Sequence, residues 1–125
     1  MVKFHGLMEG SLQAFISHVD GRIVFANSAA ADIFGCTPSE MLELTMWDFM
    51  LPSEVPRLKA YGHARIEGDP VPERYQMQAR RLDGTPMELE FLVCTEINEG
   101  QRVFHIFVQN RTNEHQAQRL LASSE

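Results

Sequence analysis

The sequence predicts an α+β domain in which two strands precede a cluster of short helices and three strands of an antiparallel meander follow it. First, Asp20-Gly21 separates two short apolar runs, which is the strongest local signal for a β-hairpin. Second, helix starts and stops follow one another closely between residues 27 and 68. Third, apolar and polar residues alternate after residue 73 with the period of two that is typical of strands.

The length and composition are those of one globular domain. The 125 residues are enough to bury roughly two-thirds of the surface that the unfolded chain exposes. Hydrophobic residues make up 44% and charged residues 22% of the chain, which is ordinary for a soluble protein. No apolar run approaches the roughly 20 residues that cross a bilayer, and the first residues lack a secretory signal. We therefore expect a cytoplasmic protein without membrane contact.

The net charge argues against nucleic acid as a partner. Eleven basic residues stand against seventeen acidic ones and give a net charge of −6, whereas binding to a nucleic-acid backbone needs a concentrated basic face. The densest basic cluster, Arg80 and Arg81 beside Arg74, is small and fits the solvated face of a strand. We expect no direct contact with nucleic acid.

The spacing of cysteines and histidines does not predict a metal site. Cys36 and Cys94 lie far apart and form no Cys-x-x-Cys pair. The five histidines are scattered, and none stands three or four residues from another. Because a structural metal needs ligands at regular spacing, we expect none. Both cysteines are interpreted as small buried hydrophobic residues.

The N-terminal part predicts a helix followed by a hairpin. Apolar residues recur at near-helical spacing over residues 4–12, so we expect a helical cap over residues 1–13. A short amphipathic helix of this kind needs a surface to lie on. Paired strands are expected at residues 14–19 and 22–26, on either side of the Asp-Gly turn.

Capping signals place the helices of the middle segment. Asn27 or Ser28 can cap a first helix, which a glycine ends. Thr37 and Glu40 form a capping box with a proline at the first helical position between them. A longer helix is expected from about residue 55 to residue 66, with a glycine again at its end.

The C-terminal half predicts three strands and a helix. Residues 73–81 and 87–97 alternate, but residues 102–110 are apolar on both faces. A two-sided strand must be covered on both sides. The middle helices can cover one face of the sheet, and the N-terminal helix or a second subunit the other. Residues 112–125 read as the start of a connecting helix with Leu120 and Leu121 near its end.

Four segments in this order resemble a PAS domain across roughly residues 8–121. "VDGRIVFANSAAADIFGCTPSEML" is similar to the opening of that family, "WDFMLPSE" to its middle helix, "RRLDGTPMELEF" to its Asp-Gly hairpin, and "QNRTNEHQAQ" to its exit into a connecting helix. The resemblance implies a five-stranded antiparallel sheet with helices over one face and a PAS core at residues 14–111. It also implies sensing or protein interaction in a bacterial signalling protein, such as a two-component system or a transcription regulator.

The family's cofactor residues are not matched here. Light-sensing relatives carry a reactive cysteine about six residues before the proline of the middle helix region, and that position is Met46. Haem-binding relatives use a histidine at the start of the long helix, whereas His63 lies near its far end. Trp47 occurs in relatives with and without flavin. We therefore expect neither haem nor a light-reactive flavin. The exit also departs from the family's Asp-[Ile/Val]-Thr-Glu pattern, because Asn110 replaces the aspartate.

A small pocket between the helices and the sheet is the candidate ligand site. Its expected walls combine aromatic side chains with methionines, which adapt to irregular gaps. The candidates are Phe34, Trp47, Phe49, Met50, Leu58, Tyr61, Met77 and Phe91. Two interpretations stay open: the pocket holds a small organic ligand, or these side chains fill the space themselves.

The sequence does not predict an enzyme. It contains no Gly-x-Ser-x-Gly, no phosphate-binding glycine loop and no His-Glu-x-x-His. Asp48 reads as a helix cap. Two functions compete: a sensor whose ligand signal passes through the helix beginning near Thr112 to an effector outside this chain, and a ligand-free scaffold for dimerisation or docking.

Both functions predict a homodimer, because a long apolar strand face should not be left in water. The partner surface is expected to use the N-terminal helix and one face of the last strands. The candidates are Leu7, Met8, Tyr75, Leu92, Cys94, Phe104 and Ile106.

Overall fold

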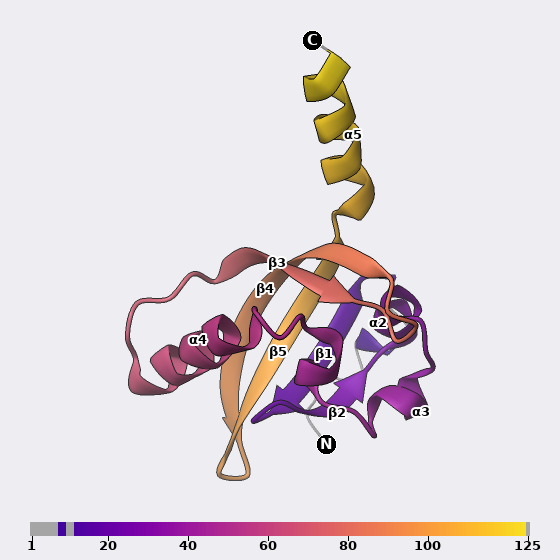
Figure 1. Cartoon of the computed structure of the whole chain (residues 1–125). Coiled ribbons are helices and arrows are strands. Elements are labelled where there is room, and N and C mark those ends of the chain that lie inside the picture. Colours follow the sequence, from indigo (N-terminus) through magenta and orange to yellow (C-terminus); the bar gives the residue numbers. More distant parts are fainter. Residues whose placement is uncertain (1–7, 10–11, 125) are drawn as a thin grey trace.

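A computed structural model describes residues 8–9 and 12–124 and shows a five-stranded antiparallel sheet in the order β2-β1-β5-β4-β3 (Figure 1). Short helices cover one face of this sheet, which confirms the predicted α+β fold. The elements are β1 (Ala14–Val19), β2 (Arg22–Ala26), α2 (Ser28–Phe34), α3 (Pro38–Met41), the 3₁₀ helix η1 (Met46–Phe49), α4 (Val55–Glu67), β3 (Arg74–Arg80), β4 (Pro86–Asn98), β5 (Gln101–Asn110) and α5 (Thr112–Ser124). The helical cap expected over residues 1–13 falls mostly outside the described residues.

The β1–β2 hairpin forms where the Asp-Gly signal places it. Asp20 and Gly21 have φ angles of 50° and 87°, and such positive values at both turn positions match the twist of a tight hairpin. Glycine is required at position 21 for a second reason, because a Cβ there would lie 2.4 Å from Nε1 of Trp47. The glycine therefore allows the indole ring of Trp47, from η1, to pack directly against the turn.

Asn27 joins the first hairpin to the first helix and to the chain before β1. Its Oδ1 accepts from the backbone N–H groups of Phe15 and Ala30, at 3.1 and 3.0 Å. Its Nδ2 donates to the carbonyls of Met8 and Gln13, both at 2.8 Å. The side chain is 1% exposed. One buried amide thus caps α2 and also bonds the backbone at the start of β1 and just before it.

The helices after α2 are fixed by local caps. Thr37 and Glu40 exchange both bonds of the predicted capping box, at 3.1 and 2.9 Å. Thr45 and Asp48 form a second pair at the start of η1, where the Asp48 carboxylate accepts from the Thr45 backbone at 2.8 Å. A hydrogen bond from the Met46 N–H to the Gly21 carbonyl, at 2.7 Å, then joins η1 to the β1–β2 turn.

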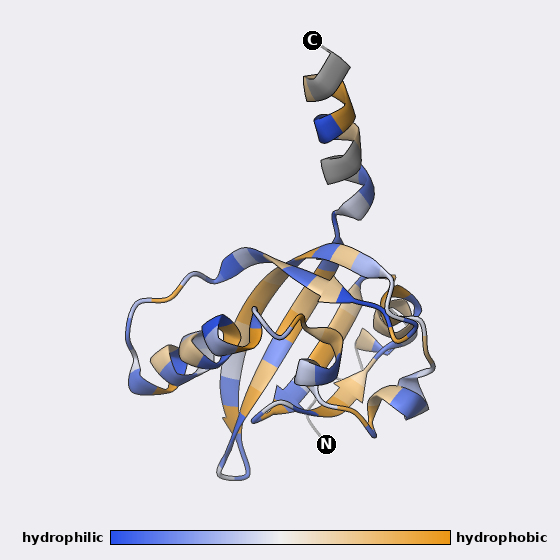
Figure 2. Ribbon diagram, in the orientation of Figure 1, coloured by the Kyte–Doolittle hydropathy of each residue, from blue (hydrophilic) through white to orange (hydrophobic). Residues whose placement is uncertain are grey.

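The core lies between the helices and the inner face of the sheet. Figure 2 shows hydrophobic residues along the central strands, with mixed polarity on α4. The fully buried large side chains include Phe34, Phe49, Phe91, Met41 and Met50. Phe34 and Phe49 pack with their ring centroids 4.5 Å apart. The methionine-rich stretch around residues 41–50 is therefore mainly core.

The pairing of β5 corrects part of the predicted partner surface. Cys94 pairs with His105 and Leu92 with Phe107, and directly paired residues point to the same face of a sheet. Phe104 and Ile106 therefore point to the opposite, helix-covered face, where they are 6% and 3% exposed. The prediction that they share a partner surface with Leu92 and Cys94 was wrong, because the residues of β5 are apolar on both faces and the sequence pattern leaves the facing ambiguous.

The outer face of the sheet carries an aromatic and polar cluster. The Phe15 ring lies 5.5 Å from that of His105 and 5.1 Å from that of Phe107. His105 Nδ1 is 2.7 Å from Ser17 Oγ, and its Nε2 is 2.7 Å from Glu96 Oε1. The Ser17–His105–Glu96 arrangement resembles the catalytic triad of a hydrolase. Ser17 is fully buried, however, so its hydroxyl is not accessible to a substrate. The three polar residues tie β1, β5 and β4 together.

Cys94 also lies on the outer face and is exposed. The expectation of a buried hydrophobic cysteine there was wrong, because position 94 is on the polar side of β4. Cys36 is partly buried and packs against the core. Of the other surface candidates, Met8 is partly buried, and Leu7 lies outside the described residues.

Candidate functional site

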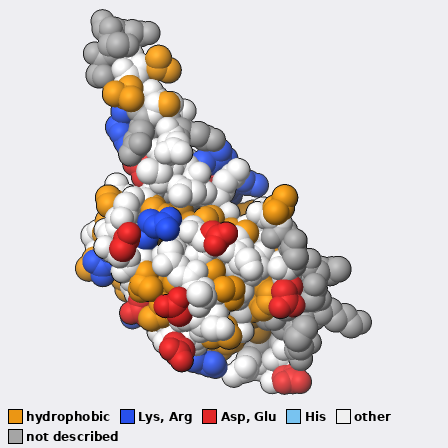
Figure 3. Space-filling model, turned by 90° about the vertical axis from the view of Figure 1, so that its right-hand side faces the viewer, with side chains coloured by type: hydrophobic (Ala, Val, Ile, Leu, Met, Phe, Trp, Pro, Cys, Tyr) orange, Lys and Arg blue, Asp and Glu red, His pale blue; other side chains and the backbone are white. Residues whose placement is uncertain are grey.

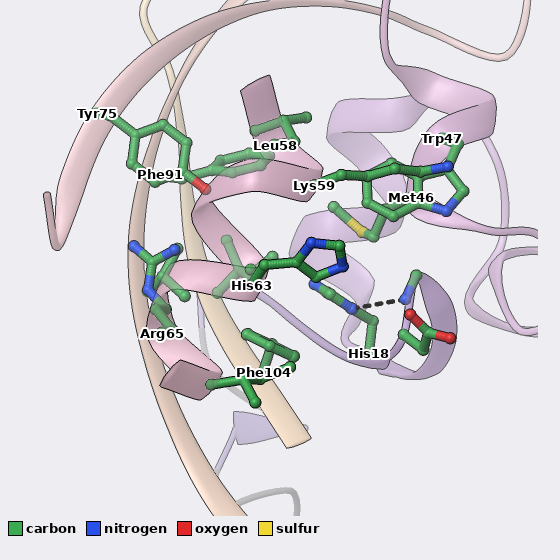
Figure 4. A pocket seen from close by; sticks show the side chains of 16 residues that line it. His18, Met46, Trp47, Leu58, Lys59, His63, Arg65, Tyr75, Phe91 and Phe104 are labelled. Atoms are coloured by element: carbon green, nitrogen blue, oxygen red, sulfur yellow. Dashed lines mark hydrogen bonds between the residues drawn. The ribbon is translucent and has the colours of Figure 1, made fainter. Parts of the chain in front are cut away.

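A cavity of about 390 Å³ lies between α4, η1 and the inner face of the sheet. Its volume is at the lower end of the roughly 300–1,000 Å³ of ligand pockets. We call it the α4 cavity. It is lined by His18, Asp20, Gly21, Met46, Trp47, Leu58, Lys59, Gly62, His63, Arg65, Ile66, Tyr75, Phe91, Val93, Phe104 and Ile106 (Figure 4).

Gly62 leaves room for the cavity beneath α4. A Cβ at this position would meet only the Phe104 ring, at 4.0 Å. Glycine inside a helix costs roughly 1 kcal/mol relative to alanine, and here nothing in the backbone of α4 requires it, since its φ is not positive. The missing side chain lets α4 approach the Phe104 ring at the edge of the cavity.

Trp47 forms the wall on the side of η1. Its indole is half-buried and lies against Gly21 of the hairpin turn. The Lys59 ammonium stands 5.3 Å from the ring centroid, within range of a cation–π interaction. Because Trp47 is the chain's single tryptophan, its fluorescence reports on this wall alone.

His18 lies at the end of β1 beneath α4 (Figure 4). Its Nδ1 accepts from the Gly21 N–H at 3.1 Å, and its ring stacks on Phe104 with centroids 4.9 Å apart. Burial lowers the pKa of His18 to about 4, against the opposing pull of Asp20 and with a smaller contribution from Arg65. The imidazole is therefore neutral at physiological pH.

Arg65 and Tyr75 form the opposite wall. The guanidinium of Arg65 lies 5.7 Å from the Tyr75 ring centroid and donates to the Pro72 carbonyl at 2.5 Å. Burial raises the pKa of Tyr75, and the nearby charge of Arg65 only partly offsets this. The Tyr75 ring also meets Tyr61 edge-on, at 4.8 Å. The wall thus presents an aromatic ring backed by a cation.

The structure places three of the eight candidate pocket residues in the lining: Trp47, Leu58 and Phe91. Tyr61 contacts the wall from behind through Tyr75. The remaining four pack in the core instead of lining the cavity: Phe34, Phe49, Met50 and Met77.

The sequence analysis missed the polar part of the lining. His18, Lys59 and Arg65 come from β1 and α4, and their convergence depends on tertiary packing. Gly62 was the one local signal available, because an interior helix glycine usually has a packing reason. His63 is an exposed residue of the lining. The lining thus combines aromatic and apolar side chains with two cations, one carboxylate and two histidines.

The start of α5 is held by a network around the beginning of β4, which we call the α5 junction. The Thr112 hydroxyl accepts from the Glu88 N–H at 3.0 Å and donates to Asn110 Oδ1 at 2.6 Å. Asn110 Oδ1 also accepts from the Thr112 N–H at 3.0 Å. The amide oxygen of Asn110 therefore caps this turn without the carboxylate that the family pattern has there.

Four arginine–glutamate contacts surround the same junction. Glu90 lies 2.7 Å from Arg74 and 3.4 Å from Arg111, and Glu88 lies 3.0 Å from Arg119 of α5. The hydrogen bond from Arg74, with Arg111 nearby, holds the pKa of Glu90 below its usual value. The fourth contact is a backbone bond, from the Arg111 N–H to the Glu88 carbonyl at 2.8 Å. Beyond this point α5 projects away from the body (Figure 1).

A profile of the PAS domain matches residues 12–113 of the chain. The chain belongs to the PAS family. The resemblance indicated by the four sequence segments is therefore confirmed. The match takes in the whole cavity lining and the Asn110–Thr112–Glu88 hydrogen bonds of the α5 junction, whereas Arg119 lies beyond it.

One curated relative of this PAS domain is a sensor protein. The chain is 28% identical over 102 residues to the C4-dicarboxylate transport sensor protein DctS of Rhodobacter capsulatus, a match that covers 79% of this chain and 16% of DctS. It therefore spans about a sixth of that relative's length. We conclude that the chain is a PAS domain of the kind found in signal-transduction sensors.

Solved PAS domains share its fold. A PAS domain from a two-component sensor histidine kinase is 15% identical, with a TM-score of 0.70, and the match covers 86% of this chain and 92% of that one. The PAS domain of an HTR-like protein from Haloarcula marismortui is 22% identical, with a TM-score of 0.66 and coverages of 86% and 88%. Within residues 8–9 and 12–124, no helix is both long and apolar enough to span a bilayer, and no group of three or more metal-ligating side chains gathers.

Proposed function

We propose that this PAS domain is the sensory module of a larger bacterial signalling protein, and that a small organic ligand in the α4 cavity is its input. The observation that carries the proposal is the cavity itself, which combines an apolar floor with polar side chains at its walls. A core whose side chains filled the space would support scaffolding instead. No haem or light-reactive flavin is part of the proposal, because the expected haem and photoadduct positions carry other residues.

The output is proposed to pass through strands that the cavity and α5 share. Phe91 and Val93 of β4 form part of the cavity floor, and Glu88 and Glu90 of the same strand hold the α5 junction. A shift of β4 on ligand binding would therefore move the anchor of the helix. The effector, a kinase or a transcription regulator for example, is proposed to follow α5 outside this chain, in the cytoplasm.

Native mass spectrometry of freshly purified protein, with an absorption spectrum, tests the input. We expect a retained mass of a few hundred daltons or less on part of the protein, without visible absorption. The Gly62→Leu variant is the matched control, since a leucine side chain beside Phe104 would extend into the cavity and should remove the retained mass. A retained mass that is unchanged in this variant, or its absence from wild type even when cell extract is added back, contradicts the proposal.

A ligand-free dimerisation scaffold is the second candidate function. Leu120 and Leu121 on α5 are 71% and 69% exposed, and Figure 3 shows hydrophobic side chains along this projecting helix. Adjacent leucines on a helix that leaves the body suit a helix–helix seam between two copies. Light scattering on wild type and on the Leu120→Gln/Leu121→Gln variant tests this seam, and a dimer that keeps an empty cavity would favour the scaffold over the sensor. We expect a homodimer that becomes monomeric, and two equal molar masses would contradict it.

A further inference from the structure

We propose, on the basis of the proposed ligand-sensing function, that the α4 cavity selects a small organic anion: a carboxylate attached to a flat apolar or aromatic body. Arg65 and Lys59 would hold the carboxylate, and the aromatic floor would hold the body. The inference rests on the charges of the lining, on what its aromatic rings already contact and on the shape of the floor.

The lining has an excess of positive charge in an acidic chain. Lys59 and Arg65 stand against one carboxylate, that of Asp20, although the whole chain has a net charge of −6. The ion pairs found among the described residues engage neither of these two cations. By contrast, Arg57 on the same helix pairs with Glu54 at 3.0 Å. The positive charges of Lys59 and Arg65 are thus not neutralised by these ion pairs and can interact with an anionic ligand.

The aromatic rings of the walls are unsuited to a cationic ligand. Cation recognition by an aromatic cage needs ring faces to which the cation can bind. Here Lys59 already lies over Trp47 at 5.3 Å, and Arg65 over Tyr75 at 5.7 Å. A ligand ammonium would meet these two like charges, which is unfavourable in a partly enclosed site.

The donors suit a carboxylate. Arg65 gives one N–H to the Pro72 carbonyl, and a guanidinium has five N–H donors in a planar fork that matches a carboxylate. The ammonium of Lys59 has three. His18 adds no positive charge near neutral pH, because burial keeps it unprotonated and its Nδ1 accepts from Gly21.

The floor suits a flat apolar body. Phe91, Phe104 and Ile106 are buried side chains of β4 and β5 that line the cavity. A Cβ at Gly62 would already contact the Phe104 ring at 4.0 Å, so a flat body would lie beside this contact, against Phe91 and Ile106. A short dicarboxylate has charge at both ends and would place one carboxylate on this apolar floor, which costs desolvation without a partner.

A matched set of probes tests the class by Trp47 fluorescence, with calorimetry as a second readout. The probes are 3-phenylpropionate, its neutral amide, 3-phenylpropylamine and succinate. We expect 3-phenylpropionate to bind about tenfold or more tighter than the amide, since charge-assisted hydrogen bonds exceed neutral ones. The amine and succinate should bind more weakly still.

Three variants locate the origin of this preference. Arg65→Gln should remove most of the tenfold preference for the anion, Arg65→Lys should restore part of it, and Arg119→Gln on α5, outside the cavity lining, should leave it unchanged. Equal or tighter binding of the amide, the amine or succinate overturns the assignment, as does an Arg65→Gln variant that keeps the preference. If none of the four probes binds, this ligand class is wrong, whereas a mass retained from cells would still support a ligand-sensing function.

Discussion

Acid should destabilise this PAS domain through His18, and the size of the effect follows from its surroundings. The pKa of the imidazole is lowered from 6.5 to about 4 by burial in the folded state. Between these two values the unfolded chain binds a proton at His18 and the folded chain does not. Stability is therefore lost as the pH falls from about 6.5 towards 4, and above 6.5 the group has no effect on it.

The full shift would correspond to about 3 kcal/mol. Because the ring is partly exposed, solvent screening reduces this, and we expect about 1 to 2 kcal/mol between pH 7 and pH 5. The matched variant is His18→Asn, whose amide oxygen can still accept from the Gly21 N–H but does not titrate in this range. Its loss of the stacking on Phe104 lowers stability equally at both pH values.

Urea unfolding at pH 7 and pH 5, followed by far-ultraviolet circular dichroism, measures the effect. The wild type should lose about 1 to 2 kcal/mol more than His18→Asn over this interval, because the other ionisable groups are common to both proteins and their effects cancel in the difference. Parallel losses in the two proteins, or a larger loss in the variant, would refute the reasoning that burial keeps His18 neutral.

Three further predictions concern single residues. Gly62→Leu should abolish probe binding, measured by calorimetry, while the unfolding free energy, followed by thermal melts, changes by about 1 kcal/mol or less. Gly62→Ala should keep binding, because its Cβ would meet Phe104 at an ordinary 4.0 Å. Asn27→Ala should cost about 3 kcal/mol or more in urea unfolding, since it leaves buried donors of β1 and α2 unsatisfied; a loss below 1 kcal/mol contradicts its role. Gly21→Ala should cost about 2 kcal/mol and shift the Trp47 emission maximum, because of its positive φ and the 2.4 Å approach; an unchanged spectrum contradicts the contact.

Local signals predicted the elements, and long-range packing decided the site. The β1–β2 hairpin and the Thr37 cap lie where the sequence places them, because their determinants are a few residues apart. The facing of Phe104 could not be predicted in the same way, since both faces of β5 are apolar and only its pairing with β4 assigns them. Physically, facing depends on register, and register is set between strands that are distant in sequence.

The cavity lining shows the same division. Trp47 and Leu58 were predicted because large apolar residues near short helices tend to face the sheet. Phe34 and Phe49 met the same criterion, but they pack on each other and fill their space. A sequence predicts which side chains will be buried more readily than where their packing leaves a gap.

The α5 junction is held by two kinds of contact, hydrogen bonds and an exposed ion pair, which respond differently to salt. The Asn110–Thr112–Glu88 hydrogen bonds fix the point where the helix leaves the sheet. The Glu88–Arg119 pair, about two turns further along α5, has an arginine that is 61% exposed. Salt screens such an exposed pair but hardly affects short hydrogen bonds at the pivot. As ionic strength rises, the Glu88–Arg119 pair should weaken and the range of angles that α5 adopts should increase. The hydrogen bonds at the start of α5 should keep its point of attachment unchanged.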